Sequence, residues 1–171
     1  MLLTMIRPHA PSVDRLVAEP PAETGHLRLH ALDGPHPTLG SVAAVPEEFA
    51  APPCEIERSG VFGLHDTDIN QYVFTGAYVS LLGAHLALLV SRTGADVGQH
   101  MVDRIAVIFR TPFTAGAPYA VRGKLYRSGD RTLALIGVHP VGPGGPSPRS
   151  AVFGRVEGRA EGDGDGSCDQ R

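Results

Sequence analysis

Residues 76–91 form the feature that most limits how this chain can fold, because they are apolar on nearly every side. As a helix this segment is ~24 Å long. A helix without a wide polar face has to be enclosed by other elements rather than lie on a surface. Thr75 suits the N-cap, and Arg92 and Gly94 supply a cation and a C′ glycine at the other end. The segment therefore predicts one long buried helix.

Runs with strand character stand on both sides of this predicted helix. One run precedes the helix and four follow it, at residues 56–64, 104–109, 119–126, 132–139 and 150–156. A tight turn at residues 128–130 and a Gly/Pro-rich stretch at 141–148 separate the last three runs. A buried helix followed by a consecutive antiparallel meander predicts an α+β fold, with the helix against one face of a single sheet.

Composition divides the chain into three parts. Nine of the fifteen prolines lie in residues 1–53, so we expect a Pro-rich N-terminal extension that is only partly ordered, with a short helix at 12–18 and a short strand at 26–32. Residues 54–160 carry the patterned domain. Residues 161–171 contain no apolar residue beyond one cysteine, which predicts a disordered tail.

Charge and hydropathy exclude several kinds of partner. The net charge is −3 and no run of Lys and Arg occurs, so we expect no nucleic-acid partner. No stretch approaches the ~18–20 apolar residues that cross a membrane, so we expect no membrane partner and a cytoplasmic protein. The histidines show no metal-ligand spacing with a carboxylate, and we expect neither a metal nor a cofactor.

Polar groups gather where the first strand gives way to the helix, in the run GLHDTDINQYVFTGAY at residues 63–78. Two carboxylates, Asp66 and Asp68, stand close to Asn70 and Tyr72. Polar groups that enter a core carry a desolvation cost, so their density here points to a use. Asp and Asn also cap turns before helices. The spacing alone leaves both interpretations open.

This run resembles the hotdog-fold acyl thioesterases, in both the 4-hydroxybenzoyl-CoA thioesterase and the acyl-ACP thioesterase branches. The series Asp-Thr-Asp-x-Asn-Gln-x-Val followed by Tyr is similar to a series in that family, and residues 105–121 resemble the passage that follows it there. The resemblance covers residues 56–158. It implies a hotdog domain, which is an antiparallel sheet wrapped around one long buried helix. It also implies a thioester hydrolase that acts on an acyl-CoA or acyl-carrier-protein substrate as a homodimer or higher homo-oligomer.

The resemblance also implies roles for individual residues. Asp68 matches the catalytic carboxylate, which acts as general base or nucleophile, and Asn70 matches the asparagine that orients it. Tyr72 stands where the acyl-ACP branch has histidine, and we expect it to orient the reactants. The residues expected to bind substrate are Val73, Phe74, Thr75, Gly76, Tyr78 and His85. Backbone amides of residues 74–76 are expected to hold the oxyanion, because free N–H groups at a helix start stabilise negative charge.

Alternatives remain open at this stage. Tyr72 and Phe74 make the site narrower and more apolar, which favours a non-catalytic acyl-binding module in a biosynthetic pathway. The series from Asp68 to Asn70 is shared with the hydratase/dehydratase branch of the fold, but Val73 replaces the histidine of that branch. His85 is more typical of a core or dimer-contact histidine than of a functional group. The arginines of the later strands are more typical of a solvated sheet face than of a phosphate or carrier-protein contact; they are Arg110, Arg122, Arg127 and Arg131.

Overall fold

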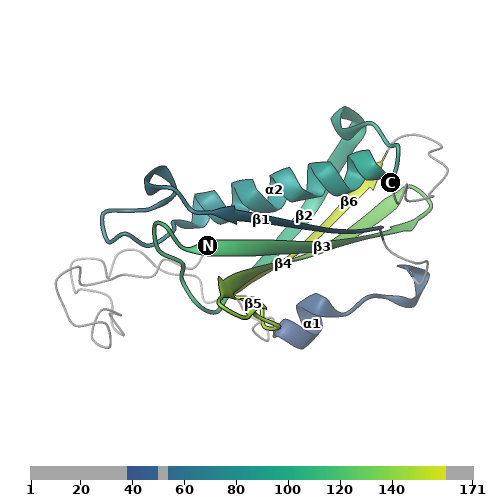
Figure 1. Ribbon diagram of the computed structural model, residues 1–171. Coiled ribbons are helices and arrows are strands. Elements are labelled where there is room, and N and C mark those ends of the chain that lie inside the picture. The colour runs from purple at the N-terminus through teal and green to yellow at the C-terminus, as the bar shows by residue number, and fades with distance from the viewer. Residues whose placement is uncertain (1–37, 50–53, 161–171) are drawn as a thin grey trace, which may run out of the picture. The chain divides into compact units, whose positions relative to one another are not determined.

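One antiparallel sheet forms the frame of the computed structural model, which describes residues 38–49 and 54–160 (Figure 1). Its strands are β1 (Cys54–Val61), β2 (His100–Phe109), β3 (Pro118–Ser128), β4 (Arg131–Gly142), β5 (Gly145–Pro146) and β6 (Val152–Ala160). The order across the sheet is β1-β3-β4-β6-β2, and the short β5 pairs with β4. The edge strands are therefore β1 and β2.

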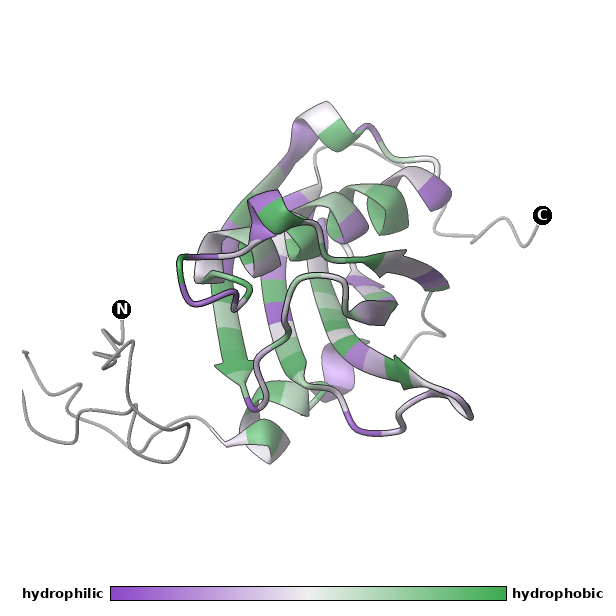
Figure 2. Cartoon of the chain, turned by 60° about the vertical axis from the view of Figure 1, so that its left-hand side comes forward, coloured by the Kyte–Doolittle hydropathy of each residue, from purple (hydrophilic) through white to green (hydrophobic). Residues whose placement is uncertain are grey.

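Helix α2 (Thr75–Arg92) lies along one face of this sheet. Its buried side chains include Leu82 and Leu89, which belong to one core cluster with Val121 and Ile136 of the sheet. Figure 2 shows hydrophobic residues along α2 and the strands that it covers. Each fully buried side chain of this size contributes ~1.5–3 kcal/mol, so this interface is the main source of stability.

The other face of the sheet, called the outer face below, is partly covered by a short N-terminal segment (Figure 1). This segment forms helix α1 (Leu39–Ala43) and the 3-10 turn η3 (Glu47–Phe49). Phe49 packs with Leu133 and Leu135 in a second, smaller cluster of buried residues. Part of the predicted N-terminal extension is thus folded against the sheet.

The predicted α+β architecture of one sheet and one buried helix is confirmed, but the predicted consecutive meander is wrong in one place. Strand β2 pairs with β6 at the far edge instead of lying beside β3. The connection at residues 110–117 makes this crossing because it is hydrogen-bonded to the segment before α2. Within it, Phe113 O accepts from Val73 N at 2.9 Å.

Two predicted boundaries also differ from the structure. The strand predicted at residues 56–64 ends at Val61, because the 3-10 turn η4 (Leu64–Asp66) follows, and Asp66 and Asp68 are therefore not part of that strand. The N-cap of α2 is Phe74 rather than Thr75.

Several other expectations fall on the ends of the chain. The helix predicted at 12–18, the strand predicted at 26–32 and the tail predicted at 161–171 lie outside the described residues. In the part of the chain that the structure describes, no helix has both the length and the hydropathy needed to cross a membrane.

Candidate active site

A tight turn at residues 68–72 connects η4 to helix α2. Two backbone hydrogen bonds close this turn. Asp68 N donates to Tyr72 O and Gln71 N donates to Asp68 O, each at 2.9 Å. Gln71 has a φ of 62°, the left-handed region that costs a residue other than glycine roughly 1–2 kcal/mol. Such a conformation persists where the surroundings fix it, and it is common at functional sites.

The side chain of Asp68 caps this turn and is exposed to solvent. Its Oδ1 accepts from Asn70 N at 2.8 Å and from Tyr72 N at 3.3 Å. Among residues 38–49 and 54–160, nothing donates a hydrogen bond to its Oδ2. One carboxylate oxygen is thus held in place by backbone amides, while the other can accept a proton.

The second carboxylate of the motif, Asp66, serves the fold instead. Its Oδ2 accepts from Gly63 N at 2.8 Å, its backbone O accepts from Phe74 N at 3.0 Å, and Nε2 of His65 lies 3.3 Å from its Oδ1. Burial raises the pKa of Tyr119, and the negative charge of Asp66 raises it further. Asp66 therefore fastens the end of η4 to the start of α2.

The N-terminus of α2 follows this turn and carries two open amides. Ala77 N donates back to Phe74 O at 3.0 Å, and no side chain of residues 38–49 and 54–160 caps the helix. This leaves the N–H groups of Thr75 and Gly76 at the first two helical positions. The amide of Phe74, which we had also expected to bind an oxyanion, already donates to the carbonyl of Asp66. Open amides and the positive end of the helix dipole both favour negative charge at this position.

The ring of Phe74 lies over the first turn of α2. A Cβ on Gly76 would lie only 2.7 Å from the Cε2 atom of that ring, so the ring occupies the space that a larger residue needs. Phe74 is 44% exposed, and it forms an apolar wall beside the open amides.

The loop after β2, residues 110–117, forms the neighbouring side of the site. Thr114 makes an antiparallel bridge with Tyr72, and Gly116 N donates to Phe62 O at 2.8 Å. Sequence analysis missed this contact, because contacts between distant segments leave no periodicity. The resemblance of residues 105–121 to the passage that follows the motif in the thioesterases is the one signal that could have indicated it.

Two residues predicted to bind substrate, Val73 and Tyr78, are buried in the core. The hydroxyl of Tyr78 accepts from Phe113 N at 3.0 Å, and the rings of Phe62 and Phe109 have centroids 5.6 Å from its own. Burial raises the pKa of Tyr78, so its hydroxyl stays protonated. Tyr78 thus joins the helix to the loop after β2.

His85 stands apart from the other predicted site residues. It lies ten residues after Thr75, which is ~15 Å along the helix. Its ring packs between α2 and β3, where a Cβ on Gly123 would lie 2.6 Å from its Nε2. Among the described residues this Nε2 has no hydrogen-bond partner. Burial lowers the pKa of His85, outweighing a hydrogen bond to the backbone of Ile56 that raises it. The ring is therefore neutral near neutral pH.

The turn and the helix start together offer acid–base and electrostatic groups at one exposed place. Asp68 has a free carboxylate oxygen, and the open amides of Thr75 and Gly76 follow within the same short segment. A carboxylate there can take a proton from water, and the amides can bind an oxygen that gains negative charge. In residues 38–49 and 54–160, no three side chains of His, Cys, Asp or Glu gather as a metal site.

Solved structures with a similar fold include an acyl-CoA hydrolase and proteins described as thioesterases. An acyl-CoA hydrolase from Staphylococcus aureus, solved with coenzyme A, has a TM-score of 0.56 and 14% identity, over 68% of this chain and 69% of that one. The protein smu.793 from Streptococcus mutans UA159, bound to acetyl-CoA, has a TM-score of 0.56 and 9% identity, over 66% and 85% of the two chains.

A thioesterase superfamily structure from Jannaschia sp. CCS1 has a TM-score of 0.54 and 14% identity, over 66% of this chain and 72% of that one. No protein-family model and no curated protein sequence matches the chain. At these identities the likeness establishes the fold, and the chain has the hotdog fold of these thioesterases.

Proposed function

We propose that the protein hydrolyses a thioester of coenzyme A. The observation that carries the proposal is the exposed carboxylate of Asp68, which backbone amides fix at the N-terminus of α2 in a chain with the hotdog fold. Two solved structures with this fold hold coenzyme A or acetyl-CoA, which favours CoA as the carrier over an acyl carrier protein. The alternative substrate is the same acyl group on an acyl carrier protein, and a comparison of hydrolysis rates distinguishes the two carriers.

In the proposed reaction, Oδ2 of Asp68 takes a proton from water as the water oxygen attacks the thioester carbonyl. The carbonyl oxygen becomes an oxyanion, which the amides of Thr75 and Gly76 stabilise. When the tetrahedral intermediate collapses, the C–S bond breaks and the leaving sulfur takes the proton back from Asp68. The products are a free acid and a free thiol. Asn70 and Tyr72 hold the carboxylate through their backbone amides.

A panel of acyl-CoA and acyl-carrier-protein thioesters tests this proposal through the release of free thiol. We expect the purified full chain to hydrolyse at least one acyl-CoA faster than the same acyl group on a carrier protein. The reverse preference would assign the carrier protein as substrate. Binding of every thioester without release of thiol would overturn the proposal.

A non-catalytic acyl-binding module is the second candidate, and the ring of Phe74 favours it. This ring lies over the first turn of α2 and narrows the approach to the open amides. If Phe74 blocks catalysis, Phe74→Ala creates or increases thiol release. If the protein is a hydrolase, the same change leaves kcat similar and alters the preferred acyl group.

The active form proposed here is a homodimer that pairs through β2. This edge strand exposes four large apolar side chains, whereas the opposite edge, β1, exposes one and carries several charges. Unpaired edges with apolar side chains favour pairing with a second chain. The apolar side chains of β2 are Met101, Val102, Ile105 and Phe109.

Light scattering tests the dimer with one variant on each edge. We expect twice the monomer mass for the wild type and for Val61→Lys on β1. Ile105→Lys places a charge on β2, and we expect it to give monomer. A wild type that stays monomeric at micromolar concentration would contradict this assembly.

A further inference from the structure

A hollow of about 530 Å³ lies on the outer face of the sheet, opposite to α2. Its floor comes from β3, β4 and β6, and its walls come from α1 and the loop before β6. Every charged residue that lines it is basic, and we call it the basic hollow. These residues are Arg110, Arg122, Lys124 and Arg149.

Two of the four cations are neutralised by the neighbouring strand β1. Arg122 Nε lies 2.8 Å from an oxygen of Glu57, and Lys124 Nζ lies 2.5 Å from an oxygen of Glu55. Both ion pairs are exposed to solvent and lie on the β1 side of the hollow. Because each cation is matched by a glutamate, the two pairs add no net charge to the hollow.

The other two cations, Arg110 and Arg149, have no acidic partner among the described residues. Arg110 Nη1 makes a contact of 3.4 Å with Ser150 O, and its backbone N donates to Ala151 O at 2.8 Å. Arg110 therefore lies against the segment that carries Arg149. An excess of two positive charges is thus gathered at one end of the basic hollow.

The hollow also has an apolar part. Ala151 N donates to Val138 O, so the two arginines lie near this position of β4. Phe153 pairs with the neighbouring Gly137, and Leu135 lies two residues further along the strand. Both line the hollow together with Leu39 of α1. Lys124 pairs with Leu135 from β3, and Glu55 matches its charge. The basic hollow therefore places apolar side chains beside two arginines that have no acidic partner among the described residues.

We propose that the basic hollow binds an amphipathic anion, which has one carboxylate or phosphate head on a hydrocarbon chain. Arg110 and Arg149 pair with the head, because guanidinium groups bind the oxygens of such anions in a bidentate manner. The chain lies on Leu135 and Phe153 below α1. A volume of about 530 Å³ suits a small molecule of this kind. The site lies on the opposite face from Asp68 and does not rest on the proposed hydrolase activity.

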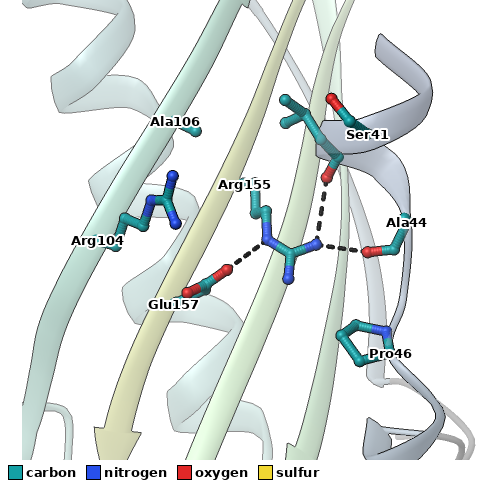
Figure 3. Close-up of a pocket in the computed structure, with 8 residues that line it drawn as sticks. Ser41, Ala44, Pro46, Arg104, Ala106, Arg155 and Glu157 are labelled. Atoms are coloured by element: carbon teal, nitrogen blue, oxygen red, sulfur yellow. Dashed lines mark hydrogen bonds and ion pairs between the residues drawn. The ribbon is translucent and has the colours of Figure 1, made fainter. Parts of the chain in front are cut away.

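A second hollow, of about 410 Å³, lies on the other side of α1 and shows a different use of arginine (Figure 3). Arg155 donates there to the carbonyls of Val42 and Ala44 and pairs with Glu157, so it fastens α1 to the sheet. Arg104 lines the same hollow and stands apart from these bonds. Arg104 is thus a cation on the same face that the proposal does not use, which makes it a suitable control.

Isothermal titration calorimetry on the full chain tests the proposal with decanoate, decyl phosphate and uncharged decanol. We expect the wild type and Arg104→Ala to bind at least one of the two anions, and to bind decanol more weakly. In the double variant Arg110→Ala/Arg149→Ala we expect the affinity for that anion to fall roughly tenfold or more, because charge-assisted hydrogen bonds are lost. Unchanged thermal melting of the double variant shows that it is folded.

Each outcome decides between the possibilities. Tighter binding of decanoate identifies a free carboxylate as the ligand class, and tighter binding of decyl phosphate identifies a phosphate ester. Equal binding of decanol, or an unchanged affinity in the double variant, would overturn the proposal. The second result would place bound decanoate elsewhere, for example beside α2, and so separates this site from the proposed acyl site.

Discussion

An aspartate that caps a turn lies near each end of helix α2, but only the N-terminal one stands beside groups that can take part in catalysis. Before the helix, Asp68 Oδ1 accepts from Asn70 N at 2.8 Å, and after it, Asp96 Oδ1 accepts from Gly98 N at 2.8 Å. Both aspartates are exposed, and each caps the amide two residues later. A capping aspartate is therefore not a site by itself.

The difference between the two ends lies in the helix groups that each aspartate meets. Asp68 precedes the open amides of Thr75 and Gly76, where the helix dipole favours negative charge. Asp96 follows the C-terminus, where Thr93 donates both its N–H and its hydroxyl to Val90 O. A developing oxyanion is stabilised at the first end and repelled by carbonyl groups at the second.

Removing the charge of each aspartate is the strongest test of this contrast. Asp68→Asn keeps the shape and the cap but removes the proton acceptor, so we expect kcat for thioester hydrolysis to fall by ~10²–10⁴-fold. Asp96→Asn makes the same chemical change at the other end, and we expect kcat within a factor of about two. Initial rates of thiol release measure both.

The capping interpretation of Asp68 gives the opposite outcome. Asn caps nearly as well as Asp, so on that interpretation both variants keep wild-type rates and wild-type melting temperatures. A wild-type rate in folded Asp68→Asn would leave this residue as a turn cap only.

A proline at the first helical position removes one open amide without disturbing the helix. Phe74 has φ −79° and ψ 156°, which suits a following proline, and proline is favoured at this position. We therefore expect Thr75→Pro to keep the melting temperature. Loss of one oxyanion donor typically costs ~10²–10³-fold in kcat, and we expect a fall of that order.

The matched change at the other end is Val97→Pro, which follows Asp96 at the start of the 3-10 turn η5 (Val97–Gln99). We expect it to leave kcat unchanged. A wild-type rate in folded Thr75→Pro would remove the Thr75 amide from the mechanism.

The fold was predictable from this sequence because its strongest signals are local. The apolar sequence of α2 predicted that the helix is buried, and the strand-like runs around it predicted the sheet that buries it. The position of β2 was not predictable, because its partner β6 is set by the contacts of residues 110–117 with the segment before α2. Contacts between distant segments leave no periodicity in the sequence.

The site was predictable only in part, for a similar reason. The resemblance to the thioesterases pointed to Asp68 and to the start of the helix, but residue type and spacing did not separate Asp68 from Asp66, whose carboxylate accepts from Gly63 N. Helical spacing placed His85 on the same face as Tyr78, and both proved to face the core. Which polar group is exposed depends on the turn at Gln71, and only the structure reveals that turn.

The hydroxyl of Tyr72 gives a smaller test of the turn before α2. Its backbone already holds Asp68, so Tyr72→Phe leaves the turn intact and removes only the phenolic hydroxyl. One neutral hydrogen bond contributes ~0.5–1.5 kcal/mol, so we expect kcat to fall by tenfold or less. Tyr126→Phe on the outer face is the control and should not change the rate. A loss as large as that of Asp68→Asn would make Tyr72 a proton donor.

The middle of α2 offers the smallest effect, and it bears on stability rather than on rate. Burial lowers the pKa of His85 in the folded protein, so the unfolded chain binds more protons once the pH falls below the ordinary histidine value of about 6.5. The contribution of neutral His85 to the free energy of unfolding is therefore fully present above that pH and is lost progressively below it. The pKa values of His100 and His139 shift in the same direction, so the wild-type melting temperature should fall between pH 7 and pH 5.

His85→Leu removes one of the three groups, and we expect its melting temperature to fall less steeply over the same range, by a few degrees. Parallel curves for the two proteins would mean that His85 is protonated equally in the folded and unfolded states. Because this change touches neither end of the helix, the rate at neutral pH should stay at the wild-type value.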